Sequence, residues 1–527
     1  MRDLFARAEF RAAGDAYDRA VDEGAAPSAE DDLLRARILL KEDENRAVAF
    51  LIRRPPKPSG QQRGRWELWL AVGYARMRDF ERADHHFSLA ERLLTAPADK
   101  AQLAYHRARA SLLEGRIDDA LRYADEMSVD RTQETKIARE ILRSGILSQE
   151  ERYRDAAQAS IDAIRLIGRR REDYLEQWFH AVQNLALLGR ELAFDEAVKI
   201  AREEVDADVY WPEDVRTQRF QALKAVGWSC ALRGDMLGCF RYLRAAERSI
   251  PGDAFRTILL LDRAYFARIV GEQNWALDEI AKAENIAENV DWQQLPGEER
   301  VGLLLLAQAT APLDRERARF YLARYKGLDR IRSPILLFAF DHRLEAFAAY
   351  TEGVVRQAAN DGAGAEESYR KAWSIFDRIG YGWRAARAGI RLFEITKKDR
   401  WRHLAEDKLE ALPQSWLARE LRSRETALNM PSIKLPPMQG KVFAMLCQKM
   451  TTAEIAGALS LSQHTVRNHL KAVFKAYGVN NRAALVAEAA ARGEVPIPAN
   501  RSESTSAASS AGSRLPFQVL DNQASFT

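Results

Sequence analysis

A short segment near the C-terminal end of the chain concentrates positive charge and hydrogen-bond donors at helical spacing. In SQHTVRNHLKAVFKAYGVNNR, which begins at Ser462, positions 463, 464, 467, 468, 471 and 475 share one face of a helix. That face carries three cations and no acid, whereas a solvated helix normally mixes signs to gain pairs four residues apart. Such a face favours a polyanionic partner, although an ordinary basic surface helix is the alternative. The polar candidates are Ser462, Gln463, His464, Thr465, Arg467, Asn468, His469, Lys471, Lys475 and Arg482.

The positive charge is local to this part of the chain. Over all 527 residues, 80 basic and 76 acidic side chains give a net charge of only +4. Between Lys434 and Arg492, eight Lys and Arg residues face two Glu residues, a difference of +6, so the remainder is near −2. The chain is therefore no general polyelectrolyte, and any contact with nucleic acid is expected in this segment.

The other face of the same helix is apolar. Its stripe consists of Val466, Leu470, Val473, Phe474 and Tyr477, at intervals of three and four residues. A stripe of this kind packs a helix onto its neighbours, so that the cationic face stays free to meet phosphates and base edges.

We expect four short helices between residues 434 and 493. Pro437 can occupy the first position of the first helix. Thr452 is the expected N-cap of the second helix, 453–459, and Ser462 is that of the third. The apolar residues expected in their core are Val442, Met445, Leu446, Ile455, Ala456 and Leu459. The second and third helices, joined by a tight turn, form a helix-turn-helix, whose second helix fits the DNA major groove.

This unit resembles the LuxR/FixJ-type DNA-binding domain over roughly sixty of the 527 residues. The matching residues are Glu454-Ile455-Ala456, Leu459, Ser462-x-x-Thr465-Val466-Arg467-x-His469, and Gly478-Val479 followed by Arg482. The resemblance implies that the residues facing bases are Arg467, Asn468 and Lys471. It implies phosphate contacts from Thr465, His469 and Arg482, with Gln463 and His464 able to reach either.

The resemblance also implies a homodimer through the fourth helix, which should run from Asn481 to Arg492 and end at Gly493. The small apolar face available for that contact is Leu485, Ala489 and Ala490. The departures from the family lie in and just after the first helix, where Pro436 to Lys441 lack the usual capping hydroxyl and two acids, and Lys449 replaces a glycine. These departures leave the cationic face unchanged. Contact with RNA polymerase is possible.

Most of the chain before this unit carries a repeated helical pattern. A small residue returns 34 to 47 positions apart, with a turn and an apolar residue before it and another apolar residue four positions after it. The small residues are Ala13, Ala47, Ala83, Ala120, Ala156, Ala197, Cys239, Ala276, Ala318 and Ala365. Two helices that cross closely need a small side chain at the contact, and one such hairpin cannot bury its apolar face alone. The pattern predicts stacked helical hairpins.

The pattern resembles tetratricopeptide (TPR) repeats. The copy that fits best places Leu223, Val226, Gly227, Cys230, Cys239, Leu243, Ala246 and Pro251 on that repeat's consensus positions. The other copies are longer and poorer, and an unrelated helical bundle is the alternative. The fold class we predict is all-α, with a TPR-like helical-hairpin solenoid followed by a small four-helix LuxR-type helix-turn-helix domain.

The sequence predicts no metal site, disulfide framework or cofactor. Cys230 and Cys239 are expected to face each other across one hairpin as small core residues rather than as a redox pair, and Cys447 is isolated. The pair His85-His86 is expected on a helix surface rather than on a metal.

We predict four regions. These are a degenerate solenoid at 1–380, capping and linking helices at 381–429, the helix-turn-helix domain at 430–493 and a disordered tail at 494–527. An exposed loop is expected at 53–60, within the solenoid.

The preferred function is that of a bacterial, cytoplasmic transcription regulator that reads double-stranded DNA. Its solenoid groove would sense a protein, a peptide or a small ligand. No phosphate-binding loop, His-Glu-x-x-His or Gly-x-Ser-x-Gly motif appears, so no enzyme is predicted, and no apolar stretch is long enough for a membrane span. The alternative is an interaction adaptor whose C-terminal unit only dimerises.

Overall fold

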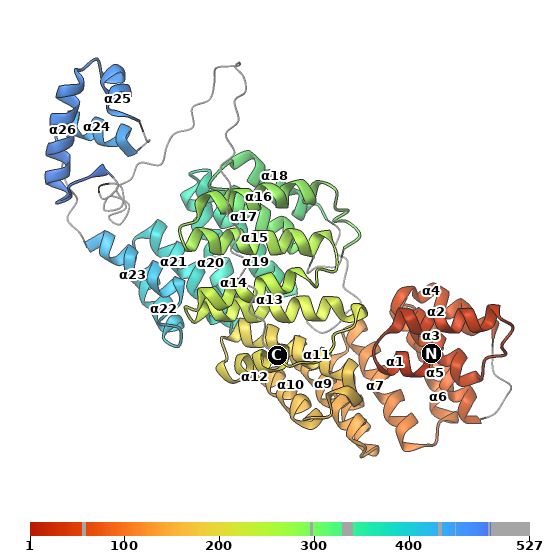
Figure 1. Ribbon diagram of the computed structural model, residues 1–527. Coiled ribbons are helices and arrows are strands. Elements are labelled where there is room, and N and C mark those ends of the chain that lie inside the picture. The colour runs from red at the N-terminus through yellow and green to blue at the C-terminus, as the bar shows by residue number, and fades with distance from the viewer. Residues whose placement is uncertain are drawn as a thin grey trace, which may run out of the picture. The chain divides into compact units, whose positions relative to one another are not determined.

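The computed structural model describes residues 1–54, 60–295, 299–328, 341–429, 435–447, 450–482 and 485. The chain divides into two compact units, Met1–Arg422 and Ser423–Thr527 (Figure 1). Throughout the described ranges the only regular elements are helices, which confirms the all-α prediction. Within those ranges, no helix combines the length and the apolar character needed to cross a membrane.

Helices follow one another along the first unit, and the last of them, α23, extends into the second unit. The α-helices are α1 (Arg2–Ala6), α2 (Phe10–Asp22), α3 (Ala29–Glu42), α4 (Glu44–Arg53), α5 (Gly60–Arg76), α6 (Phe80–Leu93), α7 (Pro97–Glu114), α8 (Ile117–Glu126), α9 (Gln133–Gln149), α10 (Tyr153–Ile167), α11 (Leu175–Leu192), α12 (Asp195–Val205), α13 (Arg216–Leu232), α14 (Met236–Glu247), α15 (Asp253–Ile269), α16 (Gln273–Glu288), α17 (Val301–Thr310), α18 (Arg315–Lys326), α19 (Asp341–Ala358), α20 (Gly362–Arg378), α21 (Gly382–Thr396), α22 (Asp399–Leu409) and α23 (Trp416–Asn429). Three short 3₁₀ turns are η1 (Met127–Val129), η2 (Arg171–Tyr174) and η3 (Glu213–Val215).

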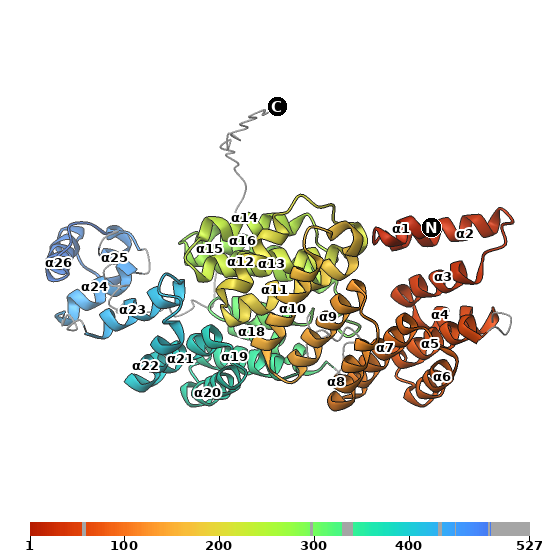
Figure 2. The ribbon, with the colours of Figure 1, turned by 90° about the horizontal axis from the view of Figure 1, so that it is seen from below.

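Each odd-numbered helix from α1 to α21 packs against the even-numbered helix that follows it, which makes a row of hairpins (Figure 2). The ten small residues that define the repeat all lie within the first four residues of the second helix of a hairpin. Their exposed fraction is 0 to 1% in every case. The predicted stack of hairpins with a small side chain at each crossing is therefore confirmed.

The hairpin of α13 and α14 shows how closely two such helices approach. A Cβ atom on Gly227 would lie 3.2 Å from the carbonyl oxygen of Cys239, so a larger side chain would push the helices apart. Cys230 and Cys239 are both buried free thiols. Burial raises the pKa of Cys230 to about 11, which keeps this thiol protonated at neutral pH. The prediction that both cysteines are buried core residues is confirmed.

The second unit contains three described helices, α24 (Pro437–Cys447), α25 (Thr452–Leu459) and α26 (Gln463–Ala476). Pro437 is the first residue of α24, as predicted. The buried core of the unit consists of Val442, Phe443, Leu446, Ile455, Ala456, Val466, Leu470, Val473, Tyr477 and Leu485. Met445 and Leu459, two residues predicted for this core, are only half-buried.

Several predicted features lie outside the described residues. They are the centre of the loop at 53–60, the start of the domain boundary at 430, Lys449, Ala489, Ala490, Gly493 and the tail at 494–527. Most of the predicted fourth helix falls in the same category.

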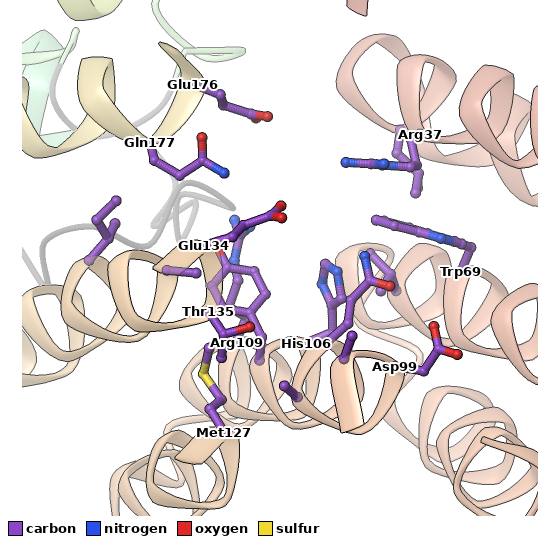
Figure 3. A pocket seen from close by; sticks show the side chains of 18 of the residues that line it. Arg37, Trp69, Asp99, His106, Arg109, Met127, Glu134, Thr135, Glu176 and Gln177 are labelled. Atoms are coloured by element: carbon purple, nitrogen blue, oxygen red, sulfur yellow. The ribbon is translucent and has the colours of Figure 1, made fainter. Parts of the chain in front are cut away.

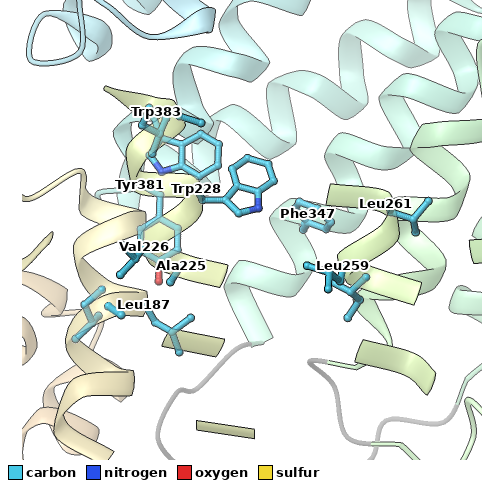
Figure 4. Close-up of a cluster of buried hydrophobic side chains, with 14 of the residues drawn as sticks. Leu187, Ala225, Val226, Trp228, Leu259, Leu261, Phe347, Tyr381 and Trp383 are labelled. Carbon is cyan, nitrogen blue, oxygen red and sulfur yellow. The ribbon is translucent and has the colours of Figure 1, made fainter. Parts of the chain in front are cut away.

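The helices predicted to cap and link the array, at 381–429, pack against it. α21 packs against α20 and α22, and it also contacts α11, about 190 residues earlier. The indole Nε1 of Trp383 on α21 donates to the carbonyl oxygen of Arg190, 2.9 Å away. The ring of Trp383 lies 5.7 Å from that of Trp228 (Figure 4). Aromatic rings therefore occupy part of the interior between α11, α13 and α21, beside a small pocket of about 90 Å³.

A buried ionic cluster also joins α11 to α21. Glu191 is 1% exposed and accepts from Arg384 Nε at 2.5 Å and Nη2 at 2.9 Å. Arg190 forms a further ion pair with the same carboxylate, and Arg343 lies 4.0 Å away. Burial alone would raise the pKa of Glu191, but the three guanidinium groups outweigh it and hold that pKa well below its ordinary range.

We expect Glu191→Gln to lower the free energy of unfolding of the first unit by about 3–5 kcal/mol at pH 7, because it leaves Arg384 buried without its counter-charge. A carboxylate with a depressed pKa stabilises the fold above its unfolded pKa of about 4.3, and this contribution is lost as the pH falls below that value. Urea denaturation between pH 7 and pH 3 should therefore show a deficit that shrinks on acidification. Glu410→Gln, at an exposed residue, is the control. Equal deficits for the two variants would contradict this role of Glu191.

Candidate nucleic-acid interface

The helix-turn-helix begins with a capping box at Thr451. The backbone N–H of Glu454 donates to Thr451 Oγ1 at 3.3 Å, and Glu454 Oε2 accepts from the Thr451 N–H at 2.6 Å. The prediction that Thr452 is the N-cap was wrong by one residue. Only from Thr451 does the third helical position hold an acid that can return the hydrogen bond, since Ile455 would fill that position if Thr452 were the cap.

A tight turn connects α25 to α26. Ser460 ends α25 in the left-handed conformation with φ of 52°, and the Leu461 N–H donates to the Ala456 carbonyl oxygen at 2.9 Å. Ser462 Oγ then accepts from the Thr465 N–H at 3.0 Å, which confirms Ser462 as the N-cap of α26. This turn sets the direction of α26 relative to α25 (Figure 1).

The apolar stripe of α26 holds the helix on its neighbours as predicted. Val466, Leu470, Val473 and Tyr477 are buried, whereas Phe474 is half-buried. The Tyr477 ring stacks on Phe443 of α24, with 5.2 Å between centroids. Because one face is used in this way, the orientation of the opposite face is fixed relative to α24 and α25.

The opposite face of α26 is open to solvent within its unit. The exposed candidates are Ser462, Gln463, His464, Arg467, Asn468, Lys471 and Lys475, and the half-buried ones are Thr465 and His469. In the part of the chain that the structure describes, none of the three cations on α26 forms an ion pair. The sequence prediction of a free cationic face therefore agrees with the side-chain positions.

Arg482 occupies a different environment from the other candidates. Its Nη2 atom donates to the carbonyl oxygens of Leu446 at 3.1 Å and Met450 at 2.8 Å. These are carbonyl groups at the C-terminal end of α24 and just beyond it, where a helix leaves acceptors without partners. Arg482 thus ties the segment after α26 to α24, and sequence spacing alone did not reveal this contact. Its phosphate contact remains a prediction.

Leu485 does not fit its predicted place on a dimer face. The side chain is fully buried in the core of its own unit, and its N–H donates to the carbonyl oxygen of Asn481 at 3.0 Å. The prediction for Leu485 was wrong because apolar spacing on a short helix does not distinguish an intramolecular contact from an intermolecular one.

The geometry of the described part of the second unit suits a polyanionic duplex. An exposed helix of 14 residues carries donors and cations along one side, and a helix of this diameter fits a major groove about 12 Å wide. Among the described residues, no group of three or more His, Cys, Asp or Glu side chains could hold a metal ion.

Comparisons with known proteins agree with this description. Residues 435–489 match the family GerE, described as bacterial regulatory proteins, luxR family. The spore germination protein GerE of Bacillus subtilis (strain 168) is 38% identical over 63 residues, which cover 12% of this chain and 85% of that protein.

Solved structures that resemble the chain include three helical proteins. They are the APC/C hetero-tetramer Cut9-Hcn1 (15% identity, 92% of this chain and 86% of that chain, TM-score 0.37), the apo form of the quorum sensor NprR from B. thuringiensis (14%, 72% and 98%, TM-score 0.41) and Naa15/Naa10 bound to HypK-THB (16%, 93% and 73%, TM-score 0.23).

We expect Thr451→Ala and Ser462→Ala each to destabilise the second unit by about 0.5–2 kcal/mol, because each leaves a helix N-terminus without its side-chain acceptor. Hydrogen exchange of the full chain, resolved at α25 and α26, measures the change. Thr452→Ala is the matched control and should have little effect. If Thr452→Ala destabilises α25 as much as Thr451→Ala does, the assignment of Thr451 as the N-cap is wrong.

Arg482→Met should speed amide exchange at the C-terminal end of α24 in the absence of DNA. The free energy of local opening at this end of α24 should fall by about 1–3 kcal/mol, because two carbonyl groups lose their charged donor. Arg467→Ala, which removes an exposed arginine, should leave that exchange unchanged. If Arg482→Met also leaves it unchanged, the positioning role described above is wrong.

Proposed function

The chain belongs to the luxR family of bacterial regulatory proteins, and we propose that it is a sequence-specific transcription regulator that inserts α26 into the DNA major groove. The observation that carries the proposal is the exposed cationic face of α26, which has no ion-pair partner in the described part of its unit. A face of this kind releases counterions when it meets a phosphate backbone.

The side chains divide into two roles by their place on the helix. In the proposed complex, bases are read by Arg467, Asn468 and Lys471, and phosphates are contacted by Thr465, His469 and Arg482. Lys475 is proposed as a further phosphate contact, because it lies on the same exposed face of α26. Gln463 and His464 lie in the first turn and can reach either group, while the Ser462 cap lies at the positive end of the helix dipole. Arg guanidinium groups match the O6 and N7 acceptors of guanine, which makes Arg467 the main candidate for specificity.

The proposed regulator acts as a homodimer through its last helix. Two copies would then read half-sites about one helical turn apart, or a multiple of that spacing. Because Leu485 lies in the core, the proposed dimer contact would use Ala489 and Ala490, the other two residues predicted for it. Contact with RNA polymerase remains open.

The first unit is proposed as the sensor of this cytoplasmic regulator. Stacked hairpins present an extended inner surface that suits a protein, a peptide or a small ligand. The competing proposal is an adaptor whose second unit only dimerises, and it predicts no binding of DNA.

Substitutions on α26 test the proposal. With full-length protein and a duplex selected from random sequences, we expect Arg467→Ala to weaken specific binding by about 1–3 kcal/mol and to relax base preference at one position. Lys475→Ala should weaken binding to all sequences about equally and reduce the salt slope by about 1. Lys441→Ala removes a cation from α24 and is the charge-matched control.

The dissociation constant of each protein for the duplex is measured by the fluorescence anisotropy of labelled DNA at several salt concentrations. Unchanged affinity and base preference for Arg467→Ala would refute the assigned reading face. Failure of the wild-type protein to select any duplex at low salt would favour the adaptor.

A further inference from the structure

A cavity of about 420 Å³ opens on the inner side of the first hairpins. Its walls come mainly from the first helices of successive hairpins, namely α3, α5, α7, α9 and α11. Figure 3 shows Arg37 and Trp69 on one wall facing Glu134, Glu176 and Gln177 across the space. A cavity of this size is within the range used for small-molecule ligands.

Arg37 lines this cavity without a carboxylate partner. Its guanidinium carbon lies 4.6 Å from the centre of the Phe5 ring and 5.1 Å from that of Trp69, so the group is held between two aromatic rings. No acid within the described ranges forms an ion pair with it. Burial lowers the pKa of Arg37, against the weaker attraction of Glu176 and Glu134. A partly desolvated cation in this position gains from an anion that enters the cavity.

Arg109 is a second guanidinium of this kind in the same cavity. Its Nη1 atom lies 3.4 Å from the hydroxyl oxygen of Tyr105, and it has no ion pair in the described part of the chain. Arg76, by contrast, donates to the Leu40 carbonyl oxygen and lies 3.9 Å from Glu44. Arg37 and Arg109 are therefore the two cations available to a ligand.

Two neutral imidazoles complete the polar lining. His106 is buried beside Trp69, with 4.8 Å between ring centres, and burial together with three nearby arginines lowers its pKa well below the ordinary value. Burial lowers the pKa of His180 to about 4. The Nδ1 atom of His180 is buried and has no hydrogen-bond partner among the described residues. These rings add hydrogen-bonding groups to the cavity without adding charge.

Most acids of the cavity are already engaged. Glu176 accepts from Lys41 Nζ at 2.6 Å, and Asp99 accepts from Arg65 Nε at 2.8 Å. Asp130 accepts from the hydroxyl groups of Thr132 and Thr135. The remaining acid, Glu134, is exposed and points into the cavity from α9 (Figure 3). Asp130 keeps its negative charge, because its donors are neutral, so Arg37 and Arg109 are balanced over the whole cavity by Asp130 and Glu134. The attraction for an anion is therefore local to the two guanidinium groups, which form no ion pair in the described ranges, and is not a net charge of the site.

We propose that this cavity binds an organic anion, in which a carboxylate or phosphate attached to a flat apolar group places its oxygens at Arg37 and Arg109 and its flat group against Trp69. Guanidinium forks match both kinds of oxyanion, and the rings of Phe5, Trp69 and Tyr105 supply the apolar contact. The identification of this anion as the regulator's signal rests on the proposed function, whereas the binding itself does not require DNA.

The test uses the full chain without DNA at constant ionic strength. Benzoate, phenyl phosphate and N-acetylphenylalanine are the probes, and benzamide is the neutral control. We expect the three anions to raise the thermal midpoint and to give saturable calorimetric titrations, whereas benzamide gives neither. The tightest of the three identifies a free carboxylic acid, a phosphate or a peptide C-terminus as the source of the anionic group.

Three variants in the cavity and one control variant outside it test the location of the site. Arg37→Gln and Arg109→Gln should each weaken benzoate binding about tenfold, since each removes one charged hydrogen-bond donor. Glu134→Gln should strengthen it about two- to fivefold, because a repelling charge is removed at the cavity. Arg122→Gln, on the exposed surface of α8, should change nothing.

The inference is overturned if no anion binds wild-type protein better than benzamide, or if both arginine variants bind benzoate as tightly as wild type. Both arginines are half-buried and lie on different helices, so one variant serves if the other fails to fold. Because no DNA is present, a negative result leaves the proposed DNA binding intact, and a failure of DNA binding leaves this result intact.

Discussion

The first unit depends on the close crossing of two helices in each hairpin. At ten of these crossings, from α1 and α2 to α19 and α20, the repeat residue is an alanine or a cysteine and is almost completely buried. With a larger residue the helices would separate, and the apolar face that each hairpin shares with the next would be lost. Since no hairpin buries that face alone, the stack is held together by its neighbours, and the first helix of each hairpin is left to line the inner side.

The inner side of the stack is more filled in one part of the first unit than in another. Between α11, α13 and α21, Trp228, Trp383 and the ion pairs of Glu191 leave only a small pocket of about 90 Å³. Between α3 and α11 the inner side stays open and is lined by Arg37 and other polar side chains. The more filled part pairs its charged groups around Glu191, whereas the open part keeps two arginines that form no ion pair with a described residue. Available charge in a cavity is expected at a binding site rather than in a structural core.

The second unit uses burial in the same way on a smaller scale. The stripe that includes Val466, Leu470 and Val473 fixes one face of α26, and the caps at Thr451 and Ser462 define where α25 and α26 begin. Arg482 joins the following segment to α24 through backbone carbonyl groups. The cationic face is therefore carried by a helix whose start, rotation and support are all set by contacts within the unit, which is what recognition of a regular duplex requires.

The sequence by itself determined the features that depend on residues close together in the chain. Helical periodicity, the ten small crossing residues, the Ser462 cap and the two faces of α26 all follow from spacings of a few residues, and the structure agrees with them. Only the tertiary structure decided the contacts between distant segments. It placed Glu191 against Arg384, turned Leu485 into the core and gave Arg482 its carbonyl partners. It also brought Arg37 and Arg109 to one cavity from separate hairpins. Local patterns specify which face of a helix is buried, but the partner of that face is chosen by packing over long sequence separations, on which spacing carries no information.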